Sequence, residues 1–343
     1  MQPPRRRLVH TGLALAALAA AAALRPAAAQ VMAPHAIDVP RWFSDSFLDF
    51  KDEAEVAARE GKRLLLYFGQ DGCPYCRELM VNSFSQKAIV DKARPRFMAV
   101  ALNIWGDREV TWVDGRRFSE KDFARHLGVQ FTPTLLFLDE QGRAVARLNG
   151  YQTPARVSAT LDYVAGRLEG RLSLAEHLAA QPSDAARPRL ADHPAFRPLS
   201  DLRRSAGART LAVLFESRSC APCDELHDEG FKRPAVREWL PRLDIVRLGL
   251  GENREITTPA GQRTTVAAWA RELGVNYTPS WVFFSDDGQE RFRVEGYLRP
   301  FHLTGSLEYA ANAGWRREPQ FQRWLQAKAE RDRAAGRPVE YWK

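Results

Sequence analysis

The residues with the most evident chemistry in this 343-residue chain are its four cysteines, which form two Cys-x-x-Cys pairs, Cys73/Cys76 and Cys220/Cys223. At the start of a helix, the first thiol of such a pair lies near free backbone N–H groups and the positive end of the helix dipole, and both stabilise its thiolate. The thiolate attacks a disulfide, and the second cysteine resolves the mixed disulfide. No cysteine remains for a structural disulfide elsewhere, so we predict reversible thiol chemistry at both pairs.

A Thr-Pro dipeptide follows each cysteine pair about 60 residues later. The two dipeptides are Thr132-Pro133 and Thr278-Pro279, and an apolar, strand-like run comes directly after each of them. Because the same combination occurs twice, we expect both dipeptides to belong to the sites that the cysteines form.

The chain contains the same sequence pattern twice. Residues 127–151 and 273–297 are identical at ten of 25 positions without a gap, and the two cysteine pairs lie 147 residues apart. A repeat of this length is a whole domain, so the sequence predicts a tandem duplication and not a solenoid.

Each copy has the same order of predicted elements. In the first copy, the apolar run 64–68 predicts a buried strand, and Pro74 suits the first turn of a helix from 74 to about 92. A strand at 97–102, a hairpin-like turn at Asp114-Gly115 and a helix opened by the capping pattern at 119–122 follow. Strands at 134–138 and 144–148 and a helix at 154–168 close the copy. The second copy repeats this order at 211–215, 221–240, 244–250, 264–273, 280–284, 291–295 and 300–313.

The N-terminus has the pattern of an export signal. Arg5, Arg6 and Arg7 precede an apolar, alanine-rich run at 8–24, and the small residues at 27–29 favour cleavage before Gln30. The adjacent arginines leave a twin-arginine route open, and an uncleaved anchor is the alternative, although the run is short for a membrane span of ~20 residues. We expect the mature chain in the periplasm.

The net charge gives little reason to expect a nucleic-acid partner. Of the formal charge of +8, four positive charges belong to arginines within the first 29 residues, which leaves +4 on the mature chain. This excess is mild and no nucleic-acid motif accompanies it, so we expect no nucleic-acid binding.

We predict five segments along the chain. The segment at 169–195 is rich in Ala, Pro, Asp and Arg and reads as a linker with a short helix at 172–180. The tail alternates charged residues with Trp315, Phe321, Trp324 and Leu325, which predicts an amphipathic helix that packs back on a domain; a partner- or membrane-binding tail is the alternative. The predicted segments are the signal peptide 1–29, domain one 30–168, the linker 169–195, domain two 196–313 and the basic tail 314–343.

Both copies resemble thioredoxin-fold proteins of bacterial periplasms. The resemblance lies in FGQDGCPYC with FTPTLLFLDEQG, and in FESRSCAPC with YTPSWVFFSDDG. The inserts at 107–117 and 255–263 are similar to the periplasmic thioredoxin associated with sulfur-oxidation (Sox) systems. The resemblance implies an α/β fold of two tandem thioredoxin-like domains, each a three-layer α/β/α sandwich with a cis-proline loop.

The resemblance also implies roles for particular residues. It makes Cys73, Cys76, Cys220 and Cys223 catalytic, and it places the substrate-binding loops Thr132-Pro133 and Thr278-Pro279 opposite them, with backbone presented to the substrate chain. Two departures stand out. Gly72 and Ser219 replace a tryptophan before the first cysteine, and Tyr67 and Leu214 replace a buried acid that helps to deprotonate the resolving cysteine.

We therefore expect a periplasmic thiol–disulfide oxidoreductase that needs no cofactor. Neither cysteine pair encloses a histidine, the feature of the most oxidising relatives, and this favours reduction or relay of disulfides. The expected partners are protein or small-molecule disulfides, with a membrane thiol transporter or disulfide oxidase as the electron partner. A disulfide oxidase or isomerase is the alternative within the same chemistry.

A module that binds a metal or an unfolded client is the alternative of a different class. Two Cys-x-x-Cys pairs can form one Cys₄ zinc site, but here each pair belongs to its own copy. Cys220, Cys223 and His227 form a C-x₂-C-x₃-H string that can bind a soft metal; otherwise His227 is an exposed helix histidine. Trp105 and Trp112 either border a substrate groove or pack in the hairpin region.

Overall fold

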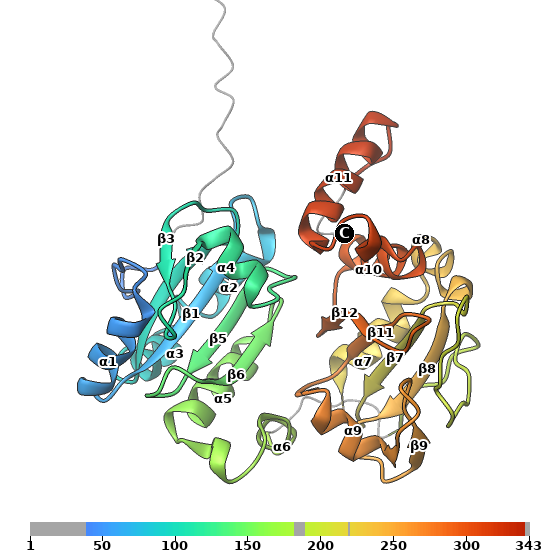
Figure 1. Cartoon of the computed structure of the whole chain (residues 1–343), viewed down its shortest axis with the longest axis horizontal. Coiled ribbons are helices and arrows are strands. Elements are labelled where there is room, and N and C mark those ends of the chain that lie inside the picture. Colours follow the sequence, from blue (N-terminus) through green and yellow to red (C-terminus); the bar gives the residue numbers. More distant parts are fainter. Residues whose placement is uncertain (1–38, 182–188, 219, 340–343) are drawn as a thin grey trace, which may run out of the picture. The chain divides into compact units, whose positions relative to one another are not determined.

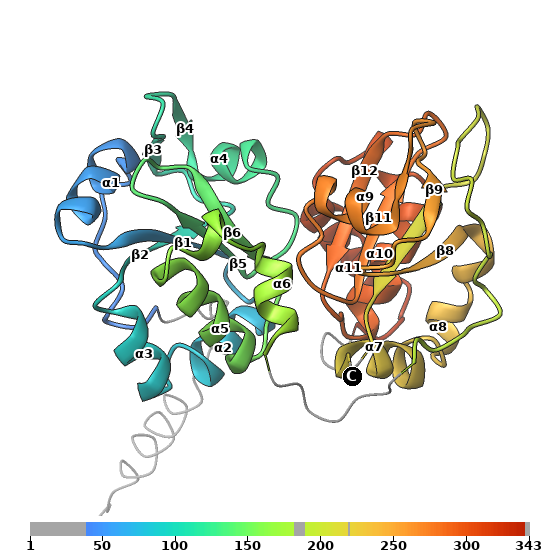
Figure 2. The same ribbon diagram turned by 90° about the horizontal axis from the view of Figure 1, so that it is seen from below.

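The structure is a computed structural model, and it describes residues 39–181, 189–218 and 220–339. The predicted export signal at 1–29 and Ser219 lie outside these described residues. The described part contains two four-stranded mixed sheets, and helices lie on both faces of each sheet (Figure 1, and Figure 2 after a turn of 90°). The predicted fold class is confirmed.

The first sheet has the strand order β2-β1-β5-β6. β1 pairs with β2 in parallel and with β5 antiparallel, and β5 pairs with β6 antiparallel. All seven residues of β1 are buried, as a central strand covered on both faces requires. The strands are β1 (Arg63–Gly69), β2 (Phe97–Asn103), β5 (Thr134–Leu138) and β6 (Ala144–Asn149).

Two helical layers cover this sheet. The alternation of side chains along β1 sends Leu64, Leu66 and Phe68 to one core, and Leu65 and Tyr67 to the other. The first core is closed by α1 (Phe50–Arg59) and α4 (Glu120–His126), and the second by α2 (Pro74–Asn82), α3 (Lys87–Ala93) and α5 (Pro154–Ala165). The remaining elements are the hairpin β3 (Glu109–Thr111) and β4 (Arg117–Ser119), η1 (Leu168–Gly170) and α6 (Leu174–Ala179).

The second sheet repeats the plan with the order β12-β11-β7-β8. Again β7 pairs with β8 in parallel and with β11 antiparallel, and β11 pairs with β12 antiparallel. Its strands are β7 (Leu211–Glu216), β8 (Asp244–Gly249), β11 (Ser280–Phe284) and β12 (Glu290–Glu295), with a hairpin of β9 (Glu255–Thr257) and β10 (Arg263–Thr265). Its helical segments are α7 (Ala221–Glu225), the π-helical turn η2 (Leu226–Gly230), α8 (Pro234–Arg237), η3 (Leu240–Arg242), α9 (Val266–Glu272), α10 (Pro300–Ala311), η4 (Gly314–Arg316) and α11 (Phe321–Ala334).

Several predicted helices are broken or shorter than we expected. The helix predicted from 74 to 92 ends at Asn82, because Phe84 turns into the core and its N–H bonds to the Leu79 carbonyl; α3 starts again at Lys87. The helix predicted at 221–240 is likewise broken into α7, η2, α8 and η3. The helix predicted from 264 begins only at Val266, because the residues before it pair with β9.

The C-terminal tail contributes a helix to the second domain. Phe321 and Leu325 of α11 are buried in the same core as Phe292 and Tyr309. Within the described ranges, no helix is long and apolar enough to cross a membrane.

Candidate redox sites

Both cysteine pairs lie at the start of a helix. Cys73 is the N-cap residue of α2, and Cys220 is the N-cap residue of α7. Each pair is closed as a disulfide, with Cα atoms 5.3 and 5.2 Å apart. The backbone N–H of Cys76 points at the Cys73 sulfur at 3.1 Å, and that of Cys223 at the Cys220 sulfur at 3.2 Å. In the reduced protein these helix-start N–H groups stabilise a thiolate on the first cysteine of each pair.

A cis-proline loop faces each first cysteine. The peptide bonds Thr132-Pro133 and Thr278-Pro279 are both cis. The hydroxyl of Thr132 lies 3.4 Å from the Cys73 sulfur, and that of Thr278 lies 3.3 Å from the Cys220 sulfur. The Thr132 carbonyl oxygen lies 3.6 Å from the Cys73 sulfur. The predicted loops and cysteines are therefore brought together in both domains.

In the first domain, a chain of hydrogen bonds sets the orientation of the Thr132 hydroxyl. The indole N–H of Trp105 can only donate, and it bonds to Gln70 Oε1 at 2.6 Å. This turns the amide nitrogen of Gln70 toward Thr132, to whose oxygen it donates at 3.0 Å. The Thr132 hydroxyl proton is then directed at the Cys73 sulfur.

In the second domain, Ser217 takes the place of Gln70. Its hydroxyl lies 2.7 Å from the Thr278 hydroxyl, and either oxygen can be the donor. The hydroxyl next to Cys220 is thus supported but not held in one orientation. Gln70 and Ser217 are not among the predicted site residues; their signal in the sequence is a matched polar position directly after the first strand of each copy.

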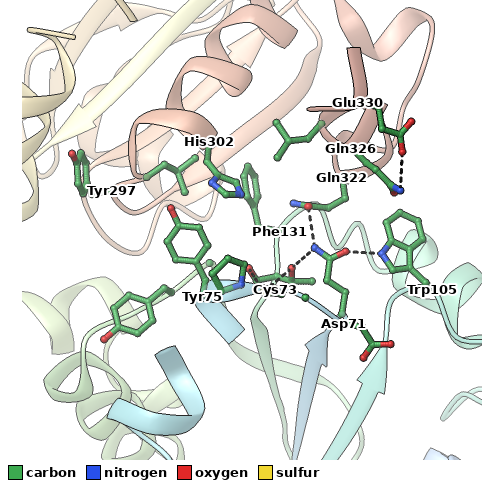
Figure 3. Close-up of a pocket in the computed structure, with 18 of the residues that line it drawn as sticks. Asp71, Cys73, Tyr75, Trp105, Phe131, Tyr297, His302, Gln322, Gln326 and Glu330 are labelled. Atoms are coloured by element: carbon green, nitrogen blue, oxygen red, sulfur yellow. Dashed lines mark hydrogen bonds between the residues drawn. The ribbon is translucent and has the colours of Figure 1, made fainter. Parts of the chain in front are cut away.

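A cleft of about 350 Å³ opens beside Cys73 (Figure 3). The cysteine itself is only 5% exposed. The lining combines aromatic side chains with amides and includes Tyr75, Trp105, Phe131, Gln70 and Gln322. Tyr297 and His302 of the second copy and Gln322 of the tail also line it, and Gln70 donates to Gln322 Oε1 at 3.3 Å. Beside the cleft, the Arg299 N–H donates to the Tyr75 hydroxyl at 3.2 Å.

A buried histidine also contacts the first cysteine pair's dipeptide. The rings of Tyr75 and His302 pack edge to face, with centroids 4.9 Å apart. Burial lowers the pKa of His302 to about 4, so the imidazole is neutral at pH 7. Tyr75 is held by burial as a neutral phenol, because desolvation raises its pKa. The side of the cleft that Tyr75 and His302 form is therefore uncharged.

A different buried polar group lies beneath the helical segment that follows each cysteine pair. In the first domain Tyr67, whose pKa burial raises, places its hydroxyl over Gly69. In the second domain the position of Gly69 is taken by Glu216, which is 1% exposed and lies 2.9 Å from His227 Nε2. His227 is 8% exposed, so the interpretation as an exposed helix histidine is wrong.

The two candidate groove tryptophans have different environments. Trp105 lines the cleft through its bond to Gln70. Trp112 packs against Phe50 and Phe123, with centroids 6.1 and 5.0 Å away. Trp112 thus serves the packing of the first domain. Across the residues that the structure describes, no group of three or more His, Cys, Asp and Glu side chains is placed to hold a metal ion.

The fold and the sites together define a class of protein: two mixed-sheet domains, each with a Cys-x-x-Cys pair at a helix start opposite a cis-proline loop. This is a tandem thioredoxin-fold protein. The family model for the thioredoxin-like domain matches residues 50–165 and again 202–311, and the chain belongs to that family.

Solved structures similar to this chain match single domains of it. One is a thioredoxin-fold protein from Helicobacter pylori, with 25% identity, 40% of this chain and 84% of that chain covered, and a TM-score of 0.33. Another is a thioredoxin from Thermus thermophilus, with 24% identity, 36% and 91% covered, and a TM-score of 0.29. A third is DsbH oxidoreductase, with 16% identity, 40% and 96% covered, and a TM-score of 0.28. No curated protein matches the chain.

Proposed function

We propose that the chain is a periplasmic thiol–disulfide oxidoreductase that reduces or relays disulfides through two Cys-x-x-Cys sites. One observation carries the proposal: in both domains the first cysteine lies at a helix start and within hydrogen-bond reach of the threonine hydroxyl of a cis-proline loop. The helix start stabilises the attacking thiolate, and the loop offers backbone groups to an extended substrate chain.

The exchange reaction follows from this arrangement. The thiolate of Cys73 or Cys220 attacks one sulfur of a substrate disulfide, the substrate S–S bond breaks, and a mixed disulfide forms while the other substrate sulfur leaves as a thiolate. The thiol of Cys76 or Cys223 then loses its proton and attacks the first cysteine's sulfur. The substrate leaves with both of its sulfurs reduced, and the protein keeps an intramolecular disulfide.

The cleft beside Cys73 favours a polypeptide substrate. Its volume of about 350 Å³ accommodates a cysteine and a neighbouring side chain, and the uncharged aromatic side that Tyr75 and His302 form suits apolar residues next to that cysteine. Reduction or relay is favoured over oxidation because no histidine lies between the cysteines of either pair. A disulfide oxidase or isomerase is the second candidate.

The periplasmic location and the kinship with Sox-associated thioredoxins are parts of the same proposal. The arginines and the alanine-rich run before Gln30 support export, and a membrane thiol transporter or disulfide oxidase then exchanges electrons with the chain. The inserts that resemble the Sox-associated protein contain β3 and β9 and end at the first residue of their hairpin partners, β4 and β10. Cell fractionation of the full chain, with and without residues 1–29, tests the location.

The test of function is turnover of the reduced chain with a disulfide-bonded protein such as insulin and a thiol donor. We expect precipitation of the reduced insulin chains to depend on Cys73 or Cys220. The proposal is overturned if turnover persists in Cys73→Ser, in Cys220→Ser and in the double variant. Equilibration of each single-site variant with glutathione gives the two reduction potentials. Two values near that of a strong oxidase, about −120 mV, favour the second candidate.

A further inference from the structure

The second domain contains a buried carboxylate–imidazole pair beneath its cysteine helix. Glu216 ends β7, and its Oε1 lies 2.9 Å from Nε2 of His227 in η2. The side chains of Glu216 and His227 are almost wholly buried, and the rings of Phe196 and Phe231 pack around the imidazole at 5.7 and 5.0 Å. A buried ionisable pair costs desolvation energy, so its presence beneath a reactive site calls for a role.

The pair is placed toward Cys223. His227 follows Cys223 by four residues in one continuous helical segment, so both lie on the same face, and both are buried. Glu216 shares a sheet face with Leu214, since side chains alternate along β7, and Leu214 packs in the core that this helical segment covers. The segment passes through a π-helical turn at η2, a distortion that is frequent at functional sites.

One carboxylate oxygen of the pair is left available to accept a hydrogen bond. Glu216 Oε2 is buried and has no hydrogen-bond partner among the described residues. A buried carboxylate oxygen without a partner can receive a donor hydrogen, because a buried polar atom that stays unpaired costs free energy. With Nε2–H of His227 donating to Oε1, Oε2 is the open acceptor.

The matching place in the first domain holds no such base. Gly69 and Met80 stand where Glu216 and His227 stand in the second copy, and the hydroxyl of Tyr67 fills the space at Gly69. Tyr67 packs in one cluster with Cys76. A buried phenol stays protonated at neutral pH, so it can donate a hydrogen bond but cannot take a proton from a thiol.

We infer that Glu216, oriented by His227, is the proton acceptor for Cys223 in the second site, and that the first site lacks this function. The inference deepens the proposed function and rests on it. With a substrate joined to Cys220, the Cys223 thiol gives its proton to Glu216 Oε2. Its thiolate attacks the Cys220 sulfur, the Cys220–Cys223 bond forms, and the bond to the substrate breaks. The substrate sulfur leaves as a thiolate and takes a proton from Glu216 or from water, so protons and electrons balance.

The surrounding charges do not supply a rival base. The titratable and charged groups on the neighbouring elements include His193 and Arg218 on either side of β7, Asp244 and Arg247 on β8, His302 on α10, and Asp224, Glu225, Asp228 and Glu229 on the helical segment itself. Glu225 and Glu229 are exposed to solvent, whereas Cys223 is buried, and Asp244 is paired with Arg204. Burial first, and His227 second, lower the pKa of His193, so it stays neutral at pH 7. Arg247 lies over the Phe196 ring and donates to the Ala191 carbonyl.

The test measures the rate of the resolving step separately from that of the first attack. The full chain carrying Cys73→Ser and Cys76→Ser is reduced and mixed with 5,5′-dithiobis(2-nitrobenzoate). A first phase forms the mixed disulfide at Cys220, and a second phase releases thionitrobenzoate as Cys223 attacks. We expect Glu216→Gln to slow the second phase by about 100-fold at pH 7, as loss of a general base does, and to leave a rate that rises up to alkaline pH. Glu216→Asp restores most of the rate.

The matched control is Tyr67→Phe in the chain whose second site is inactivated by Cys220→Ser and Cys223→Ser. We expect its second phase at Cys76 to change by less than about threefold, since no base is removed. If Glu216→Gln does not fold by circular dichroism, His227→Gln gives the same readout, with the pH midpoint of the second phase displaced. A second phase in folded Glu216→Gln or His227→Gln within about threefold of the parent, with an unchanged pH profile, overturns the inference.

The same experiment separates this inference from the proposed function. Insulin turnover that fails in the wild-type chain, together with a second phase that depends on Glu216, refutes the function and leaves the proton acceptor in place. Insulin turnover that succeeds, together with a second phase whose rate does not depend on Glu216, supports the function and refutes the role of Glu216 as proton acceptor.

Discussion

The Thr132 hydroxyl can be removed almost without change of shape by Thr132→Val. In the reduced protein this hydroxyl donates to the Cys73 thiolate, because Gln70 and Trp105 direct its proton toward the sulfur. A hydrogen bond to a charged group contributes about 1.5–3 kcal/mol, and about 1.4 kcal/mol corresponds to one pH unit of ionisation. We therefore expect the midpoint of the Cys73 alkylation profile to rise by about one to two pH units.

The assay is the rate of iodoacetamide alkylation of Cys73 between pH 4 and 10, with the modified cysteine identified by mass spectrometry. Thr278→Val should raise the Cys220 midpoint by less, since the Thr278 hydroxyl is not held in one orientation. The wild-type Cys73 should ionise at a lower pH than Cys220, because a cation, Arg77, follows the first pair and an acid, Asp224, follows the second.

Thr160→Val is the matched control for this experiment. Thr160 is fully buried, and its hydroxyl donates to the Arg156 carbonyl within α5, far along the chain from the cysteines, so loss of this hydroxyl should leave the Cys73 profile unchanged. A Cys73 midpoint in Thr132→Val that stays within about 0.3 pH unit of the wild type, or that falls, refutes the reasoning about the oriented hydroxyl.

Three further outcomes can be checked. Cys76→Ser and Cys223→Ser should each accumulate mixed disulfides at the first cysteine of the pair; adducts found at the second cysteine in the reciprocal variants contradict the assignment. Glu140→Gln should destabilise the first domain by about 1–2 kcal/mol in urea unfolding at pH 7, with Glu60→Gln, in an exposed pair, near zero. The buried Arg63 guanidinium lowers the pKa of Glu140 to about 2, so this contribution should be lost as pH falls from about 4.5 toward 2. The neutral imidazole of His302 should make the chain lose stability as pH falls from 6.5 through about 4, and His302→Gln should flatten that loss; an equal slope in both proteins contradicts it.

The local parts of this fold could be predicted because they depend on short-range rules. The strand at 134–138 follows from an uninterrupted apolar run, and the helix start at Ser119 follows from its side chain accepting from the Asp122 N–H. The end of helix α2 at Asn82 could not be predicted, because it depends on Phe84 turning into a core that is made by residues distant in the sequence.

The polar groups that support the sites depend on tertiary contacts. Gln70 meets Thr132 across 62 positions of the chain, and no spacing rule reports such a bond. Glu216 was missed because the resembling family has its buried acid six residues before the first cysteine, where this chain has Leu214, whereas Glu216 stands four residues before Cys220. Comparison of the two copies could have indicated this pair. The first apolar run ends in Gly69 in the first copy and in Glu216 in the second, and the position of Met80 is occupied by His227.

The two sites of this duplicated chain differ in which half of thiol exchange they favour. In the first site the polar support is directed at the nucleophile, through Gln70 and Thr132, while the group beneath the helix is a phenol that stays protonated. In the second site the hydroxyl is less constrained, and an ionisable pair of Glu216 and His227 lies beneath the helix instead. Because attack needs a stable first thiolate and resolution needs a base for the second thiol, the first site is suited to capturing a disulfide and the second to completing the exchange.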